Sequence, residues 1–336
     1  MLVKELGEFG LIDRIAAMLP QRPRGVIEGI GDDVAVLDTS GPEYLLATCD
    51  TQVEGVHFTR EAITAFQLGR KVAAINLSDI AAVGGEPCWG LVSLCIPGQM
   101  EVGYIEEFYL GLREEMSLAG ASIVGGNLSR MESLVVVDLT LLGQVEPRRL
   151  VRRSTARLGD AVVLTGSTGE SRAGLELIRR PEAALVCPGG QKLIERHLTP
   201  RPRLAQGRLL GGSGLVSSMI DVSDGLIADL SHICKASGKG AQIEVESLPV
   251  SPELSEAALA AGADPLQWAL AGGEDYELLF TCAEKNFPEI ERMLSEQTGT
   301  SCAKIGIITA GTGVSLRNAA GARVVAGAKG WDHFGG

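Results

Sequence analysis

Residues 29–37 read GIGDDVAVL, in which glycines precede a pair of aspartates and a short apolar run. Glycine allows the backbone to turn tightly there, and the run Val34–Leu37 is typical of a β-strand. Four more stretches place acidic residues at the edge of an apolar strand or helix. These stretches contain Asp50, Asp79, the pair Asp221 and Asp224, and the pair Glu274 and Asp275. Carboxylates are the hard oxygen ligands that magnesium prefers, so their convergence predicts a site for more than one magnesium ion.

Apolar periodicity around these stretches alternates between helical and extended patterns. In the first half, strands are predicted at 34–37, 44–47, 89–96, 122–124 and 134–145, and helices at 8–19, 64–83 and about 105–116. In the second half, strands are predicted at 161–165, 216–220, 242–245, 278–282, 303–308 and 322–325, and helices at 171–180, 191–198, 226–236 and 287–296. Such alternation is typical of α/β domains.

Two domains of ordinary size are expected from a chain of 336 residues. The composition shifts between residues 146 and 160, where Pro147 is followed by five arginines. We therefore place the boundary near residue 147, with domains at 1–147 and 148–336.

Composition excludes several classes of protein. The 30 basic and 42 acidic residues give a net charge of −12, which disfavours binding to nucleic acid or to an anionic membrane. The longest uncharged run, Pro87–Met100, is too short to span a bilayer, and the N-terminus lacks the apolar region of a signal peptide. The 7 cysteines form no C-x-x-C pair, so we expect reduced thiols in a cytoplasmic protein.

Common catalytic motifs are absent. The chain has no G-x-x-x-x-G-K-[ST] phosphate loop, no G-x-G-x-x-G after a strand, no G-x-S-x-G and no H-E-x-x-H. The usual nucleotide-loop, hydrolase and zinc-protease interpretations therefore lose their main support.

Six stretches together resemble the thiamine-monophosphate kinase family, a branch of the aminoimidazole ribonucleotide synthetase-like superfamily. They read GIGDDVAVL, TCDTQVEGVHF, NLSDIAAVGGEP, IDVSDGLIADL, GGEDYELLF and GWDHF, and the resemblance extends from about Gly7 to Phe334. The aspartate motifs are shared across the superfamily, whereas GVHF, GGEDYELLF and GWDHF point to the thiamine enzymes.

The resemblance implies a two-domain α/β fold. The N-terminal domain would bind ATP and magnesium and would pair its sheet with that of a second protomer, giving a homodimer built around a barrel. The C-terminal domain would be a second α/β unit, and ATP with several Mg²⁺ ions would lie between the two. The implied activity is ATP-dependent phosphorylation of thiamine monophosphate to thiamine diphosphate by direct in-line transfer.

The resemblance also implies roles for individual residues. Magnesium ligands would be Asp33, Asp50, Asp79, Asp221 and Asp224, and Thr48 and Cys49 stand where the family has metal-contacting hydroxyl residues. Nucleotide contacts would come from Gly125, Gly126, Arg153 and Ser223, with the two glycines forming a turn. Substrate contacts would come from His57, Glu274 and Trp331. Asn127 departs from the family, which has an aspartate magnesium ligand there, because an amide brings oxygen but no charge.

Elementary chemistry is consistent with this activity. The attacking oxygen of a phosphate acceptor is already anionic, so no catalytic base is required. Bringing two polyanions together is the difficulty, and metal ions with one or two arginines reduce that repulsion.

Two other functions stay open from the sequence alone. The first is an ATP-dependent synthetase of the same superfamily. The second is a degenerate member that binds thiamine phosphates or nucleotide without turnover, and Asn127 is the residue that leaves this alternative open. Among single residues, His57 could be a core histidine and Trp331 a buried anchor, and the arginine-rich junction could be a solvated linker.

Overall fold

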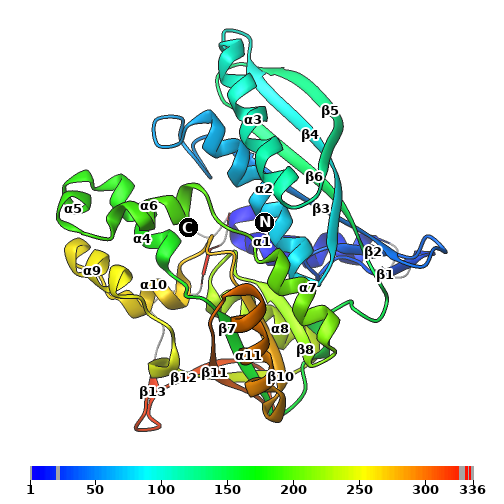
Figure 1. Ribbon diagram of the computed structural model, residues 1–336, viewed down its shortest axis with the longest axis vertical. Helices are drawn as coiled ribbons and strands as arrows, with labels where there is room; N and C mark the ends of the chain where they lie inside the picture. The colour runs from blue at the N-terminus through cyan, green and yellow to red at the C-terminus, as the bar shows by residue number, and fades with distance from the viewer. Residues whose placement is uncertain (1, 20–22, 325–329, 332, 334–336) are drawn as a thin grey trace.

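The computed structural model describes residues 2–19, 23–324, 330–331 and 333, and its two mixed sheets confirm the predicted two-domain α/β fold (Figure 1). The N-terminal sheet has the order β1-β2-β3-β6-β4-β5, and only the β4–β5 pair is parallel. Its strands are β1 (Val26–Glu28), β2 (Ala35–Leu37), β3 (Tyr44–Val53), β4 (Glu86–Pro97), β5 (Ser122–Met131) and β6 (Val136–Val145). The helices of this half are α1 (Val3–Met18), α2 (Ala65–Ala82) and α3 (Val102–Leu118).

Helices α2 and α3 pack against one face of this sheet and bury its apolar residues. Two glycines set how closely the helices approach each other. A Cβ on Gly69 would lie 2.0 Å from the Phe108 carbonyl oxygen, and one on Gly111 would lie 1.9 Å from that of Phe66. The opposite face of the sheet is not covered by a helix of the described chain and leaves Trp89 and Leu91 exposed.

The C-terminal sheet has the order β13-β12-β9-β11-β7-β10-β8. Its strands are β7 (Asp160–Thr165), β8 (Val216–Asp221), β9 (Gly240–Glu244), β10 (Leu278–Ala283), β11 (Cys302–Thr309), β12 (Gly313–Arg317) and β13 (Arg323–Val324). Helix α8 (Leu226–Ser237) shares one core with the sheet, and α7 (Leu204–Ser213) and α11 (Phe287–Thr298) share another. Apolar side chains on both faces therefore explain the continuous apolar runs of β7 and β10.

Five helices form a separate layer beside this sheet (Figure 1). They are α4 (Glu170–Arg179), α5 (Pro181–Val186), α6 (Gly190–Leu198), α9 (Pro252–Ala261) and α10 (Pro265–Ala271), and they share a small apolar core. The N-terminus of α4 is capped by Asp275, whose carboxylate accepts the backbone N–H of Gly169 at 2.6 Å and of Ser171 at 3.0 Å.

The two halves of the chain meet where α2 packs against α7. Ala81 and Ala82 of α2 belong to the same apolar cluster as Leu210 of α7. A Cβ on Gly207 would lie 2.1 Å from the carbonyl oxygen of Ala81 in α2. This contact brings the C-terminal part of α2, which carries Asp79, against the end of β8.

One predicted local feature is wrong. Gly125 and Gly126 do not form a turn after Val124, because β5 continues through them to Met131 and pairs in parallel with β4. A Cβ on Gly126 would lie 2.0 Å from the Val92 carbonyl oxygen, so glycine is required there by close strand pairing. The last residue of the strand predicted at 322–325 lies outside the described residues, as do Asp332 and Phe334 of the terminal motif.

A search of the described residues finds no helix long and apolar enough to cross a membrane.

Candidate active site

Aspartates from both halves of the chain converge on one buried position. Asp33 precedes β2, Asp79 lies on α2 and Asp221 ends β8, and each offers a carboxylate oxygen within 4.8 Å of the other two. The charge of Asp50, on β3, acts on Asp79, so this aspartate belongs to the same acidic group. We call Asp33, Asp50, Asp79 and Asp221 the aspartate cluster.

Hydroxyl donors hold two of these carboxylates in place. The Thr48 hydroxyl donates to Asp79 Oδ2 at 2.5 Å, and the Ser78 hydroxyl donates to Asp221 Oδ2 at 2.6 Å. Thr48 and Asp50 project from the same face of β3 because side chains alternate along a strand. The cluster is therefore oriented by its neighbours as well as by the backbone.

Burial and mutual repulsion both disfavour charge on these carboxylates. Burial and then the charges of Asp138 and Asp33 raise the pKa of Asp50 to about 6. The pKa values of Asp79 and Asp221 are raised well above the ordinary value, first by burial and then by neighbouring aspartates. The potential metal ligands of this site are all oxygen atoms, and bound cations would stabilise their negative charge. These residues therefore fit magnesium.

Arg153 supplies positive charge to this group. It begins the short helix η1 (Arg153–Thr155), and its guanidinium pairs with both Asp33 oxygens, with Nε 3.0 Å from Oδ2. Its backbone N–H donates to Asp32 Oδ2 at 3.2 Å. Burial, together with the charge of Asp33, raises the pKa of Asp32 to about 7.

Asp224 lies in a second acidic group with Asp229 and His232, whose ligand atoms are within 4.8 Å of one another. Asp229 has a structural role, because its Oδ2 accepts the backbone N–H of Asp224 at 3.2 Å and of Gly225 at 3.1 Å. Burial lowers the pKa of His232 to about 4, and its ring contacts that of Phe9 at 4.6 Å. Ser223 lies between Asp221 and Asp224 and is half-buried.

The three predicted substrate residues lie near one another. His57 Nδ1 accepts the backbone N–H of Val53 at 3.0 Å, and its ring centroid is 5.0 Å from that of His333. The Trp331 ring centroid is 6.0 Å from the same His333 ring, and 51% of Trp331 is exposed. Glu274 is close enough for its charge to act on the pKa of His57.

Glu274 is held by two residues that the sequence analysis missed. Lys71 Nζ lies 2.8 Å from Glu274 Oε1 although only 1% of the Lys71 side chain is exposed, and His197 Nδ1 lies 3.4 Å from Glu274 Oε2. Burial raises the pKa of Glu274, but the charge and hydrogen bond of Lys71 outweigh this, so the pKa is lowered; His197 beside it is neutral, because burial lowers the pKa of its ring to about 3. The backbone of Glu274 has a φ of 63°, a left-handed conformation that non-glycine residues rarely adopt. The sequence did contain a signal for this role, because Lys71 lies among apolar residues on the buried face of α2.

Cys49 and the Gly125–Asn127 segment lie apart from the aspartate cluster within one chain. Cys49 is exposed on the face of β3 opposite Thr48 and Asp50. Gly125, Gly126 and Asn127 lie on the edge strand β5, separated from β3 by β6 and β4. Three strand spacings correspond to about 14 Å, which is too far for Asn127 and Asp50 to share an ion in one chain.

We expect the protein without metal to be more stable at pH 5 than at pH 8. A carboxylate whose pKa is raised by folding stabilises the folded state fully below its unfolded value, and this contribution is lost as pH rises through the folded value. For Asp50 that window runs from 3.8 to about 6, and for Asp32 it runs from 3.8 to about 7. Thermal unfolding in EDTA should show a Tm several degrees lower at pH 8, and magnesium should restore it. A metal-free Tm that rises between these pH values would contradict this electrostatic account.

Two family models match successive parts of the chain. The AIR synthase related protein, N-terminal domain, matches residues 31–145, and the AIR synthase related protein, C-terminal domain, matches residues 157–318. Thiamine-monophosphate kinase from Aquifex aeolicus (strain VF5) is 38% identical and covers 99% of this chain and 100% of its own length. The Escherichia coli (strain K12) thiamine-monophosphate kinase is 37% identical and covers 98% of each chain. A solved structure described as "AaThiL complexed with AMPPCP and TMP" superposes with a TM-score of 0.85, 38% identity and 99% coverage of each chain.

Proposed function

The chain belongs to the AIR synthase-related protein family, among its thiamine-monophosphate kinases, and we infer that it phosphorylates thiamine monophosphate with ATP. The main structural observation that supports this function is the aspartate cluster, to which both halves of the chain contribute. Thiamine diphosphate and ADP are the products.

We propose that the aspartate cluster, with Thr48 and Asp224, holds the magnesium ions that accompany ATP. Magnesium bound there would neutralise charge on the phosphates of ATP and of the acceptor. Arg153 would exchange part of its contact with Asp33 for a nucleotide phosphate, because a guanidinium binds either oxyanion with the same planar donors. Ser223, between Asp221 and Asp224, would contact the nucleotide. The side chains of Cys49 and Asn127, and the glycines Gly125 and Gly126, are not assigned to this one-chain site.

The transfer requires only that the acceptor oxygen and the γ-phosphate be held in line. A terminal oxygen of thiamine monophosphate forms a bond to the γ-phosphorus as the bond to the β–γ bridging oxygen breaks, and ADP leaves with that electron pair. The acceptor oxygen is already anionic, so no protein group has to remove a proton. Buried carboxylates held by Thr48 and Ser78 would fix the relative positions of the ions and thereby of the phosphates.

We propose that His57, Glu274 and Trp331 bind the thiamine part of the substrate. Trp331 exposes a flat ring that suits stacking on a heterocycle. Glu274 offers a carboxylate held by Lys71, and its charge acts on the pKa of His57, whose ring lies 5.0 Å from that of His333. A positively charged thiazolium and N–H donors of the heterocycle would be favoured by this ionised carboxylate, which only accepts hydrogen bonds.

We propose a homodimer that covers the outer face of the N-terminal sheet. Trp89 and Leu91 are 49% and 42% exposed on that face, and the edge strand β5 exposes Val124 and Leu128. A long unpaired edge next to apolar side chains is typical of a surface that pairs with another chain. We also propose a cytoplasmic location, because the 7 cysteines form no C-x-x-C pair.

Replacement of Leu91 by lysine is therefore expected to shift the protein to monomers at micromolar concentration, because a charge would be buried without a partner in the interface. Sedimentation velocity would measure the mass. Leu259→Lys on α9 is the matched control, since Leu259 is 82% exposed outside this face, and it should stay dimeric. A monomeric mass for the wild-type protein would contradict the proposed homodimer.

The function is tested by measuring ADP release with magnesium, ATP and one acceptor at a time. Thiamine monophosphate should support turnover, whereas unphosphorylated thiamine should not, because it lacks the anionic acceptor oxygen. Binding of both ligands without ADP release would indicate the non-catalytic binder. ADP release that requires an amine and a carbonyl acceptor instead would indicate a synthetase.

A further inference from the structure

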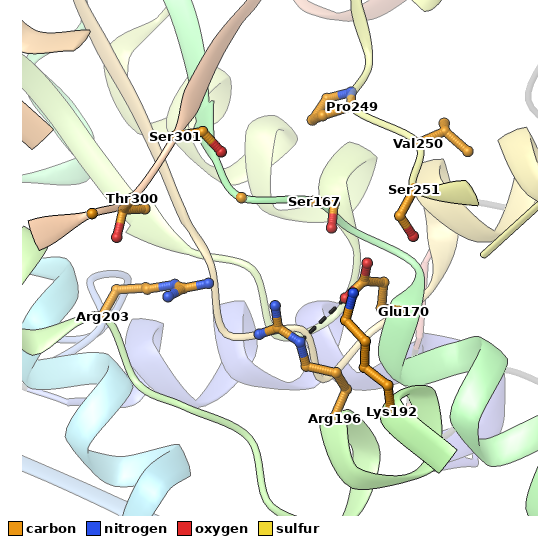
Figure 2. A pocket seen from close by; sticks show the side chains of 12 residues that line it. Ser167, Glu170, Lys192, Arg196, Arg203, Pro249, Val250, Ser251, Thr300 and Ser301 are labelled. Atoms are coloured by element: carbon orange, nitrogen blue, oxygen red, sulfur yellow. Dashed lines mark ion pairs between the residues drawn. The ribbon is translucent and has the colours of Figure 1, made fainter. Parts of the chain in front are cut away.

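A polar pocket separate from the candidate active site lies in the C-terminal half, with a volume of about 440 Å³ (Figure 2). This open pocket is lined by residues of the turn between β7 and α4, of helix α6, of the segment before α7, and of 249–251 and 299–301. None of the residues proposed above for metal, nucleotide or substrate lines it. Its volume falls in the range of small-molecule sites.

Cationic side chains enter this pocket from one side. Lys192 and Arg196 are one helical turn apart on α6, and Arg203 follows that helix. Figure 2 shows the three side chains extending into the same space, with hydroxyl groups on the other side. The hydroxyl residues that line the pocket are Ser167, Ser251, Thr300 and Ser301.

Each cation is positioned by a carboxylate. Lys192 Nζ lies 2.7 Å from Glu253 Oε1, Arg196 Nε lies 3.2 Å from Glu170 Oε2, and Arg203 Nε donates to Glu277 Oε2 at 2.7 Å. Glu170 lines the pocket while Glu253 and Glu277 lie outside its lining; these three carboxylates balance the three cations, so the pocket offers oriented N–H donors rather than a net positive charge. Because a guanidinium has five N–H donors and Glu277 accepts from only two nitrogens of Arg203, donors remain for a ligand.

We infer that this pocket binds a small molecule through a phosphate group, without a metal ion. Two positioned guanidiniums and an ammonium match the several oxygens of a tetrahedral oxyanion, and the hydroxyl groups can donate to the remaining oxygens. The pocket is larger than phosphate itself, and Pro249 and Val250 give it an apolar wall. The ligand is therefore either inorganic phosphate or a phosphate monoester with a compact organic part.

Metal dependence separates this pocket from the candidate active site. The aspartate cluster repels phosphate unless cations are bound, whereas the pocket presents its own cations. Phosphate binding measured in excess EDTA should therefore report on the pocket alone. It should also survive Asp50→Asn, which alters only the cluster.

Isothermal titration calorimetry of the full chain with inorganic phosphate in EDTA tests the inference, with ribose 5-phosphate as the second probe. We expect one saturable site. Lys192→Gln should weaken it about tenfold, the scale of one charge-assisted hydrogen bond. Lys192 is suitable because its side chain is 54% exposed, so its loss should not unfold the protein. Lys192→Gln with Arg196→Gln should abolish binding, provided that thermal unfolding shows a folded protein.

Lys304→Gln is the matched control, since Lys304 also pairs with a glutamate, Glu284, but lies outside the pocket. It should bind phosphate like the wild type. Tighter binding of ribose 5-phosphate than of phosphate would identify a monoester site, and the reverse order would identify a free-phosphate site. No saturable binding of either probe, or equal weakening by Lys304→Gln, would overturn the inference.

Discussion

Asp50→Asn is expected to lower turnover by on the order of a thousandfold, the scale seen when one group is lost from a preorganised electrostatic site. Asp50 is half-buried, the charge of Asp33 acts on it and its own charge acts on Asp79. Its negative charge would hold a cation between the phosphate groups of ATP and of the acceptor. The same substitution should not destabilise the metal-free protein and should raise its Tm at pH 8. Burial and repulsion disfavour the charged form, and asparagine removes that charge. Steady-state assays and thermal unfolding in EDTA measure the two effects.

Asp13→Asn is the control for this substitution. Asp13 lies on the exposed surface of α1 and pairs with Lys235, whose Nζ is 2.9 Å from Oδ2. Loss of an exposed ion pair should change stability by less than about 1 kcal/mol and should leave turnover unchanged. Near-normal turnover of Asp50→Asn would show that Asp50 does not hold a metal ion.

Removal of divalent cations is expected to abolish activity completely and reversibly. The aspartate cluster and a polyphosphate repel one another without cations, so the reactants should not bind productively. Excess EDTA should stop ADP release, and an excess of magnesium should restore it. EDTA saturated with magnesium beforehand is the control and should have no effect. Full turnover in excess free EDTA would refute the metal-assisted transfer.

Local patterns predicted most of the individual elements but could not show which residues meet. Asp221 lies far along the chain from Ser78, and the fold brings their side chains to 2.6 Å. The acidic residues could be recognised because their stretches are rich in glycine or lie at the edge of an apolar strand or helix. Lys71 was missed because a lysine within an apolar helix is usually solvated, whereas packing of the two halves buries this one against Glu274.

Glycines account for two of the errors in the predicted secondary structure. Helix α7 was not predicted because LAQGRLLGGS contains three glycines, which lower helix propensity. Tertiary packing overrides that propensity, since Gly207 is where α2 approaches most closely. Strand β5 was ended too early for the same reason, because Gly126 serves strand pairing that a local pattern does not reveal.

The fate of a labelled γ-phosphate tests the central claim most directly. Purified protein would be mixed with magnesium, thiamine monophosphate and ATP labelled at the γ-phosphorus. We predict that the label enters the terminal phosphate of thiamine diphosphate in a one-to-one ratio with ADP and that the protein stays unlabelled. Asp50→Asn should form labelled product on the order of a thousandfold more slowly. Label in the protein or in inorganic phosphate alone, with none in thiamine diphosphate, would contradict direct transfer by this site.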